Sequence, residues 1–236
     1  MVEQPRLFSS LPEDRSAAAL LISDSNRDAW DRLARWREWP AGALALSGPH
    51  GAGKSHMAQA WAELHTAGLC WPQDRALEVF ERFGGRVVID DADRYPDEPH
   101  LALLLDAART RPGSAVLLVG AEPPDRWPVA LRDLRSRLLA LPAATLGEPD
   151  DELLARLLER LCRARFIKLT EKAGTYLVAH MERSFAGAHA VAEAIDRIHA
   201  RGARPVSTGV ASRALRSIRA GAPEPALGDE ALEEEA

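Results

Sequence analysis

The sequence predicts an α/β domain built on a mostly parallel sheet, followed by a small all-helical domain. Short apolar stretches alternate with helical segments through the first part of the chain, and helical patterns alone follow Pro149. Hydrophobic residues make up 46% of the 236 residues, which is normal for a chain with a globular core. Strands that alternate with helices assemble into parallel sheets with helices on both faces.

The α/β domain is expected over residues 13–148, after a flexible tail over residues 1–12. Apolar positions of its first helix recur every three or four residues and Pro40 ends it, whereas the expected strands are short apolar runs. The expected elements, in chain order, are a helix over Asp24–Trp39, a strand over Ala43–Leu46, a helix over Lys54–His65, a strand over Arg86–Ile89, a helix over Leu101–Arg109 and a strand over Ala115–Val119.

The helical domain is expected over residues 149–219, and an acidic, disordered tail over residues 220–236. Leucines recur at helical spacing in the segment that follows Asp150, so that they form one apolar stripe. A residue type that favours helix N-caps precedes each of four helical patterns. These residues are Asp150, Thr170, Ser184 and Ser207.

Charge and cysteine content argue against several classes of protein. Acidic residues outnumber basic ones by 35 to 30, which argues against a broad basic DNA-binding face. Cys70 and Cys162 match no metal-ligand spacing, so we expect two reduced core thiols in a cytoplasmic protein. The N-terminus does not predict a signal peptide, and no apolar run reaches the ~20 residues that span a bilayer.

The segment from Gly48 to Ser55 matches the phosphate-binding pattern G-x-x-x-x-G-K-[ST]. Glycines let backbone N–H groups converge on phosphate oxygens, and the helix that follows points its positive end at the same anion. Lys54 would reach the phosphates of ADP or ATP, while the Ser55 hydroxyl would ligate Mg²⁺. A glycine-rich turn without a ligand is the alternative, which the flanking strand and helix disfavour. The expected loop residues are Gly48, Pro49, His50, Gly51, Ala52, Gly53, Lys54 and Ser55.

Two carboxylates follow the second expected strand, in the run "VVIDDAD". They lie at the C-terminal end of a buried strand, where open α/β sheets bind their ligands. Asp90 is expected to hold the Mg²⁺ through water, and Asp91 to polarise an attacking water. Two solvated acids at a strand end are the alternative. Many ATPases of this kind carry Glu at the second position, so the shorter Asp91 predicts slow hydrolysis.

Together the motifs resemble the AAA+ module of the bacterial replication initiator DnaA. The resemblance runs from about Leu20 to Ile218 and rests on "GPHGAGKSHM", "VVIDDADR", "LRDLRSRL" and "RSFAGAHAV" in this order and spacing. The segment "LLISDSNRDAW" resembles the one that this family places beside the adenine. The resemblance therefore implies nucleotide contacts by Leu21 and Ile22 of this segment, and by His56, which follows the phosphate loop in "GPHGAGKSHM".

The same resemblance implies roles for two arginines. Arg137, in "RSRL", matches the arginine finger that acts in trans on the γ-phosphate of a neighbouring subunit, with Arg135 as the close competitor by position. Such a finger stabilises the charge that spreads over phosphate oxygens in the transition state. Arg183 matches the arginine of the helical lid that contacts the bound nucleotide. Without the resemblance, each arginine would be interpreted as a solvated surface charge.

The chain also departs from this family's pattern. The family has a polar residue at the end of the third strand, where this chain has Val119 and Gly120. The stretch between the phosphate loop and Asp90 is short, so a trimmed strand or helix is expected there. Both features predict weak ATPase activity of the chain itself.

A DnaA-like module without the initiator's DNA-binding and N-terminal domains resembles the Hda (HdaA) family, the regulatory inactivators of DnaA. Members of that family bind the sliding clamp, the β subunit of DNA polymerase, and promote hydrolysis of the ATP held by DnaA. "QPRLF" resembles the clamp-binding pentapeptide, with Leu7 and Phe8 as apolar anchors and Gln4 as the hydrogen-bonding residue. The resemblance implies the clamp, DnaA and a second copy as partners, with DNA reached only through the clamp and a cytoplasmic location at the replisome.

Two other functions stay open at this level. One is a stand-alone AAA+ ATPase or helicase loader of DnaC type, against which the clamp-binding pentapeptide counts. The other is a non-catalytic scaffold with a relict nucleotide site. The Hda-type interpretation favours ADP as the bound nucleotide, although the residues themselves suit ADP or ATP.

Overall fold

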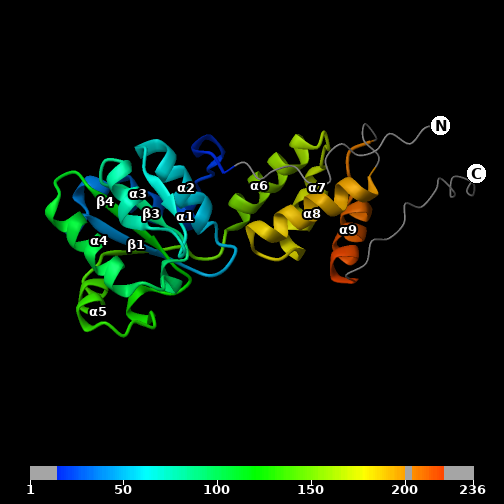
Figure 1. Ribbon diagram of the computed structural model, residues 1–236. Coiled ribbons are helices and arrows are strands. Elements are labelled where there is room, and N and C mark those ends of the chain that lie inside the picture. The colour runs from blue at the N-terminus through cyan, green and yellow to red at the C-terminus, as the bar shows by residue number, and fades with distance from the viewer. Residues whose placement is uncertain (1–14, 200–203, 221–236) are drawn as a thin grey trace, which may run out of the picture. The chain divides into compact units, whose positions relative to one another are not determined.

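The structure, a computed structural model, describes residues 15–199 and 204–220 (Figure 1). The chain divides into two compact units, residues 1–150 and residues 151–236. The tails expected at the two ends lie outside the described residues, apart from Ala220 at the end of the last helix. The predicted clamp-binding residues Gln4, Leu7 and Phe8 lie outside them as well.

The first unit is built on a five-stranded sheet in which all neighbouring strands pair in parallel. The central strands are almost fully buried, because helices cover both faces of the sheet, and their sequences are therefore continuous apolar runs. The strand order is β2-β3-β4-β1-β5. The strands are β1 (Ala43–Ser47), β2 (Gly68–Cys70), β3 (Arg86–Ile89), β4 (Ala115–Val119) and β5 (Ala143–Thr145).

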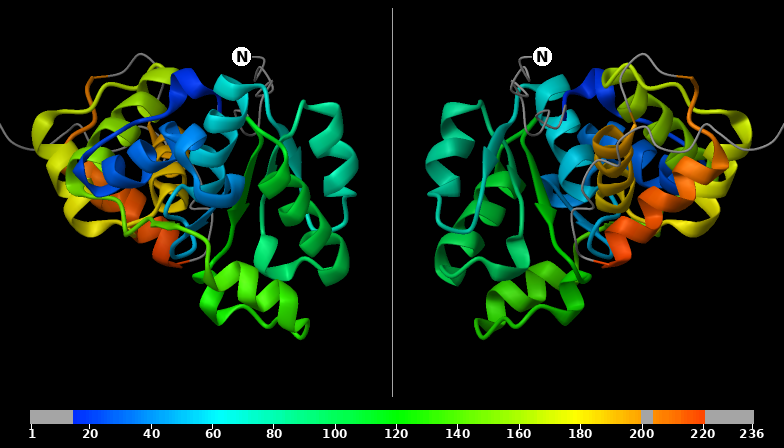
Figure 2. Two further views of the ribbon diagram at one scale, coloured as in Figure 1. Left: turned by 90° about the vertical axis from the view of Figure 1, so that its left-hand side faces the viewer. Right: turned by 90° about the vertical axis from the view of Figure 1, so that its right-hand side faces the viewer.

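Two apolar cores lie on opposite faces of this sheet. Residues of α1 and α2 pack against Leu44 and Leu46 of β1, whereas residues of α3, α4 and α5 pack against its Ala43. The two helical layers are visible on either side of the strands in Figure 2. The helices are α1 (Asp24–Ala34), α2 (Lys54–His65), α3 (Ala76–Arg82), α4 (Glu98–Thr110) and α5 (Arg132–Leu139), with 3-10 turns over Ala17–Ala19, Trp36–Glu38, Pro40–Gly42, Ala92–Arg94 and Pro124–Arg126.

The predicted bounds of α2, β3 and β4 agree with the structure, and β1 is longer by one residue. The first predicted helix is too long, since α1 ends at Ala34 rather than at Trp39. Arg35 leaves the helical region, with φ −87° and ψ 32°, and a 3-10 turn follows. This turn lets Trp36 and Trp39 enter the core beneath α1 and α2, so packing overrides the helical spacing.

Four short elements of the first unit are missing from the prediction, namely β2, α3, α5 and β5. The stretch between the phosphate loop and Asp90, expected to be trimmed, contains both a three-residue strand and a seven-residue helix. Elements of this length offer too few positions to establish a period in sequence.

Four helices make up the described part of the second unit: α6 (Asp151–Ala164), α7 (Glu171–His180), α8 (Phe185–Ile198) and α9 (Thr208–Ala220). The predicted leucine stripe lies along the buried face of α6. Its members are Leu153, Leu154, Leu157, Leu158 and Leu161.

Two of the predicted N-caps are confirmed. The Thr170 hydroxyl accepts a hydrogen bond from the Ala173 N–H at 3.2 Å, and the Ser184 hydroxyl accepts one from the Gly187 N–H at 2.9 Å. The Asp150 carboxylate accepts a hydrogen bond from the Ser25 N–H at 3.0 Å, so this residue joins the end of the first unit to α1.

Both cysteines are buried and form no disulfide. Burial raises the pKa of the Cys70 and Cys162 thiols to about 12, so both stay protonated at neutral pH. Within the described residues, none of the helices combines the length and the apolar character needed to cross a bilayer.

Candidate phosphate-binding site

The predicted phosphate-binding loop connects β1 to α2, in the strand–turn–helix order that the motif requires. Gly48, Gly51 and Gly53 adopt positive φ angles of 152°, 77° and 91°. A Cβ at Gly48 would lie 2.4 Å from the Leu146 carbonyl oxygen, so that position excludes any side chain. The glycines are therefore required by the turn itself.

The amino end of α2 faces the inside of this loop. Gly53 is the N-cap residue, and among the described residues no side chain caps the helix. Backbone N–H groups in the first turn of a helix lack intrahelical acceptors and attract anions. Lys54 and Ser55 occupy the first two helical positions, so an ammonium and a hydroxyl group flank these donors. The loop thus has the donors of an anion-binding site.

Lys54 is held inside the loop. Its Nζ donates hydrogen bonds to the carbonyl oxygens of Gly48 at 2.7 Å and Pro49 at 2.9 Å. Burial lowers the pKa of Lys54, and the carboxylates of three nearby aspartates oppose that shift in part. A phosphate would offer this ammonium a stronger acceptor than the two carbonyls. The three aspartates are Asp90, Asp91 and Asp93.

Asp90 and Asp91 follow β3, as predicted, and Asp91 adopts a left-handed conformation with φ 53°. Asp90 is partly buried and Asp91 is exposed, and the Asp91 N–H donates to the Asp90 carboxylate at 3.1 Å. The turn over Ala92–Arg94 keeps these acids beside the end of the strand. Both carboxylates influence Lys54, so the structure brings the predicted acids and the predicted lysine together.

Asp93 belongs to the same cluster and was missed by the sequence analysis. One oxygen of its carboxylate, Oδ2, accepts a hydrogen bond from the Ala121 N–H at 2.9 Å. The Ala121 carbonyl in turn accepts one from the Gly48 N–H at 3.3 Å. Ala121 therefore connects the acidic turn to the phosphate loop. The other Asp93 oxygen, Oδ1, is buried and has no hydrogen-bond partner among the described residues.

No hydroxyl side chain lies at the end of β4, where the resemblance leads one to expect it. Val119 is the last residue of the strand and is fully buried. A Cβ on the next residue, Gly120, would lie 2.9 Å from the Trp127 ring. The indole of Trp127 thus occupies the space that a side chain would need.

Ser55 and Asp90 offer one hydroxyl and one carboxylate oxygen for the predicted Mg²⁺. Oxygen ligands of this kind suit Mg²⁺, which retains waters and binds nucleotide phosphates instead of requiring an all-protein site. The described residues contain no group of three or more His, Cys, Asp or Glu side chains that would hold a metal alone. The ligand set therefore fits Mg²⁺ only together with phosphates.

The predicted adenine-side residues lie just before α1. Leu21 and Ile22 are both partly buried, and Leu21 accepts a hydrogen bond from the Asn26 side chain at 2.9 Å through its carbonyl. The His56 imidazole on α2 lies 3.3 Å from the Ser16 carbonyl oxygen. This contact holds the segment before Leu21 against the helix that follows the phosphate loop.

Arg137 lies on helix α5. Its Nε donates to Asp133 at 2.9 Å and its Nη1 donates to Asp106 of α4 at 3.1 Å, while 31% of the side chain is exposed. Arg135 is exposed, and its side chain has no hydrogen bond or ion pair within the described residues. To act as the finger, Arg137 would have to break two ion pairs, whereas Arg135 would break none with the described residues. Arg183, in the second unit, forms an ion pair with Asp151.

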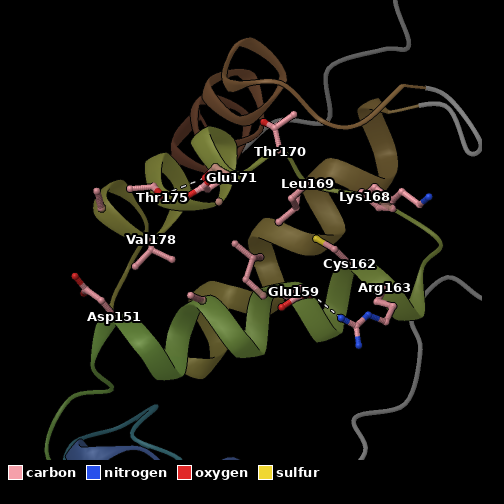
Figure 3. Close-up of a pocket in the computed structure, with 15 residues that line it drawn as sticks. Asp151, Glu159, Cys162, Arg163, Lys168, Leu169, Thr170, Glu171, Thr175 and Val178 are labelled. Atoms are coloured by element: carbon pink, nitrogen blue, oxygen red, sulfur yellow. Dashed lines mark hydrogen bonds and ion pairs between the residues drawn. The ribbon is translucent and has the colours of Figure 1, made fainter.

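A separate hollow lies within the helical unit, between α6 and α7 (Figure 3). Its volume is about 760 Å³, and Leu158, Cys162 and Val178 contribute apolar side chains to it. Charged residues such as Glu159 and Lys168 also line it. None of its lining residues belongs to the phosphate-binding loop.

No protein-family model and no curated protein sequence matches this chain. Domain III of the replication initiation protein DnaA from Thermotoga maritima matches in structure with a TM-score of 0.68 at 14% identity, over 88% of this chain and 98% of that one. AMPPCP-bound DnaA from Aquifex aeolicus matches with a TM-score of 0.57 at 13% identity, over 71% and 61%. The RuvB Holliday junction branch migration motor of Thermotoga maritima matches with 0.59 at 16%, over 80% and 68%.

These similarities show the fold of the chain, an α/β fold with a parallel five-stranded sheet that it shares with domain III of DnaA and with RuvB. The fold class predicted from the sequence is therefore confirmed. The match covers less than two thirds of the Aquifex DnaA chain, so it concerns one part of that initiator.

Proposed function

We propose that this chain binds an adenine nucleotide with Mg²⁺ at the phosphate-binding loop and uses that site to regulate the initiation of DNA replication. The observation that carries the proposal is the amino end of α2, which no described side chain caps, behind a turn in which Gly48 leaves no room for a side chain. The adenine nucleotide analogue AMPPCP in the Aquifex DnaA structure supports the choice of ligand.

Each loop residue has a role in this proposal. Lys54 is proposed to exchange the Gly48 and Pro49 carbonyls for phosphate oxygens, which requires a movement of its side chain. Ser55 and Asp90 hold the Mg²⁺ together with phosphate oxygens and water. Leu21 and Ile22 are proposed to contact the adenine, and His56 and Arg183 are proposed as further nucleotide-binding residues.

Turnover by the chain itself is proposed to be weak. Asp91 is the only one of the two catalytic candidates on this chain that would act on its own nucleotide, and its carboxylate is exposed and on a short side chain. The end of β4 offers Val119 and Gly120 in place of a hydroxyl that could orient water. A site that binds phosphates but orients water poorly favours retained ADP.

The regulatory target is proposed to be ATP bound to DnaA, as in the Hda-type regulators that the sequence resembles. Arg137 is the proposed finger, with Arg135 two residues before it. Ion pairs of partly exposed side chains contribute about 0–1 kcal/mol, so Arg137 loses little when it exchanges Asp133 and Asp106 for a phosphate. Gln4, Leu7 and Phe8 are proposed to bring the chain to the sliding clamp.

The test measures hydrolysis of DnaA-bound ATP in the presence of clamp-loaded DNA. Addition of the wild-type chain is expected to accelerate hydrolysis strongly, and a chain without its first eight residues is expected to lose most of that effect. Strong ATP hydrolysis by the chain alone, with no effect on DnaA, would favour the stand-alone ATPase instead.

A further inference from the structure

Three basic side chains surround Trp36 at the end of the sheet opposite to the phosphate-binding loop. Arg37 lies in the 3-10 turn after α1, His65 is the last residue of α2, and Arg86 is the first residue of β3. Asp90 follows the other end of β3, so one short strand separates the two regions. Trp36 and the three basic residues all belong to the first unit.

The distances around Trp36 are short. The guanidinium carbon of Arg37 lies 4.4 Å from the centre of the Trp36 ring, and that of Arg86 lies 5.9 Å from it. The His65 ring centre is 5.7 Å from that of Trp36 and 5.1 Å from that of Trp61. The indole thus holds both guanidinium groups and the imidazole within one small region.

Two buried hydrogen-bond donors around Trp36 have no acceptor among the described residues. The Nε of Arg86 and the Nε1 of Trp36 are both buried and lack a partner among the described residues, and Trp36 is only 4% exposed. Neither the Arg37 side chain nor the His65 side chain has a hydrogen bond or an ion pair with another described residue. Since a buried donor without an acceptor destabilises the folded chain, we expect these donors to serve a ligand that accepts hydrogen bonds.

No ion pair between described residues compensates the charge of this region. The charged groups that act on the His65 imidazole are Arg37 and Arg86, both of them cations, and no carboxylate is among them. These two arginines, together with burial, lower the pKa of His65. Gly84, beside the Arg86 guanidinium, carries no side chain to cover it, since a Cβ there would lie 3.6 Å from Nη2.

We propose that Arg37, His65 and Arg86 form a second anion site, which binds a phosphate group. Two guanidinium groups and an imidazole present a charge of two to three, which matches a phosphate better than a singly charged carboxylate. Guanidinium groups donate in a planar fork that fits phosphate oxygens, and cation–π contact with the Trp36 ring positions both of them in advance. The phosphate is carried by a small phosphorylated molecule or by the backbone of a nucleic acid.

A phosphate bound here would favour the protonated form of His65. The pKa of His65 therefore rises on binding, from a value that burial and the two arginines keep below its ordinary range. By linkage, binding strengthens as the imidazole becomes protonated with falling pH. This coupling gives a signal specific to the site, because the phosphate-binding loop contains no group that contacts His65.

The experiment titrates the full chain with inorganic phosphate and follows the imidazole resonance of His65 by NMR, assigned through His65→Gln. The Lys54→Ala background removes phosphate binding at the loop. Phosphate is expected to shift the resonance and to raise the pKa of His65. Arg86→Gln and Arg37→Gln are each expected to weaken the apparent affinity tenfold or more, while the exposed neighbour Arg82→Gln serves as the matched control. Arg37 is exposed, so its variant keeps the test valid even if Arg86→Gln disturbs β3.

A parallel titration with a short DNA duplex distinguishes the two sources of the phosphate group. A shift at far lower concentration than inorganic phosphate requires assigns the site to a nucleic-acid backbone, and a weaker response assigns it to a small phosphorylated molecule. The proposal is overturned if neither ligand shifts the resonance, or if Arg37→Gln and Arg86→Gln respond like the control. The proposal is also overturned if acetate shifts the His65 resonance at the same concentration as phosphate does.

Discussion

Arg137 illustrates how the surroundings of a single residue refine a role inferred from a motif. Its guanidinium connects α5 to α4 through Asp106, whereas Arg135 is exposed and makes no such contact within the described residues. A finger that acts on another subunit must reach beyond its own surface. Arg137 would have to leave two carboxylates to do so, and Arg135 would not.

We expect Arg137→Ala to retain nucleotide and clamp binding but to lose stimulation of DnaA-bound ATP hydrolysis. A finger supplied in trans contributes roughly 10³ to 10⁵ in rate, whereas a charge at the rim of an interface contributes little affinity. The measurement is the hydrolysis rate of DnaA-bound ATP on clamp-loaded DNA, together with the affinity for the clamp. Arg135→Ala is the matched control. If only Arg135→Ala loses stimulation, the finger is Arg135.

The two cysteines allow a second prediction at this scale. Cys70 and Cys162 are buried, and burial raises both thiol pKa values to about 12. The thiolate is the reactive form, so neither residue should be alkylated by iodoacetamide at pH 8 in the folded protein. Mass spectrometry is expected to find modification only after addition of denaturant. Rapid alkylation of the native chain would contradict the assigned burial.

At the scale of the elements, helix termini provide a direct test of the helical unit. The Thr170 and Ser184 hydroxyls each cap a helix that packs within this unit. We expect Thr170→Ala and Ser184→Ala each to lower the free energy of unfolding by about 1 kcal/mol, because each leaves an orphan N–H group. Thr175→Ala is the control, since that hydroxyl is exposed in the middle of α7 and bonds only to the Glu171 carbonyl. Equal effects in all three variants, measured by denaturant unfolding, would argue against the caps.

The elements that could be predicted from the sequence are those with a strong pattern. β1, β3 and β4 are central strands covered on both faces, and so they appear as apolar runs. β2 and β5 are three-residue strands at the edges of the sheet, and β5 exposes both Ala143 and Thr145. In α5 only Leu134 and Leu138 are buried, so polar residues hide its period.

The candidate site also has residues that could be predicted from the sequence and residues that could not. The loop and the two acids after β3 were predictable, because their chemistry lies in contiguous residues. The role of Asp93 was not, since its contact with Ala121 depends on how β3 and β4 align in the sheet. The cluster at Trp36 was hidden for a similar reason, because it joins a turn, a helix end and a strand start that are distant in sequence.

At the scale of the whole molecule, recruitment and chemistry are proposed to lie in different parts of the chain. We expect Leu7→Ala combined with Phe8→Ala to abolish binding to the sliding clamp, since anchor truncations cost about 2 kcal/mol or more each. The melting temperature should stay unchanged, because these side chains precede the described core. Surface plasmon resonance on immobilised clamp measures the first effect, and Arg6→Ala is the control within the same pentapeptide. Unchanged affinity of the double variant would show that the pentapeptide matches by chance.

The central claim is that the loop from Gly48 to Ser55 binds an adenine nucleotide, and thermal unfolding with and without ADP and Mg²⁺ tests it most directly. A ligand at one hundred times its Kd stabilises the folded chain by about 2.7 kcal/mol, which raises the melting temperature by roughly 5 to 10 °C. Lys54→Ala should abolish this increase, and the exposed Lys172→Ala should retain it. A wild-type melting temperature that does not respond to saturating ADP or ATP would contradict the account.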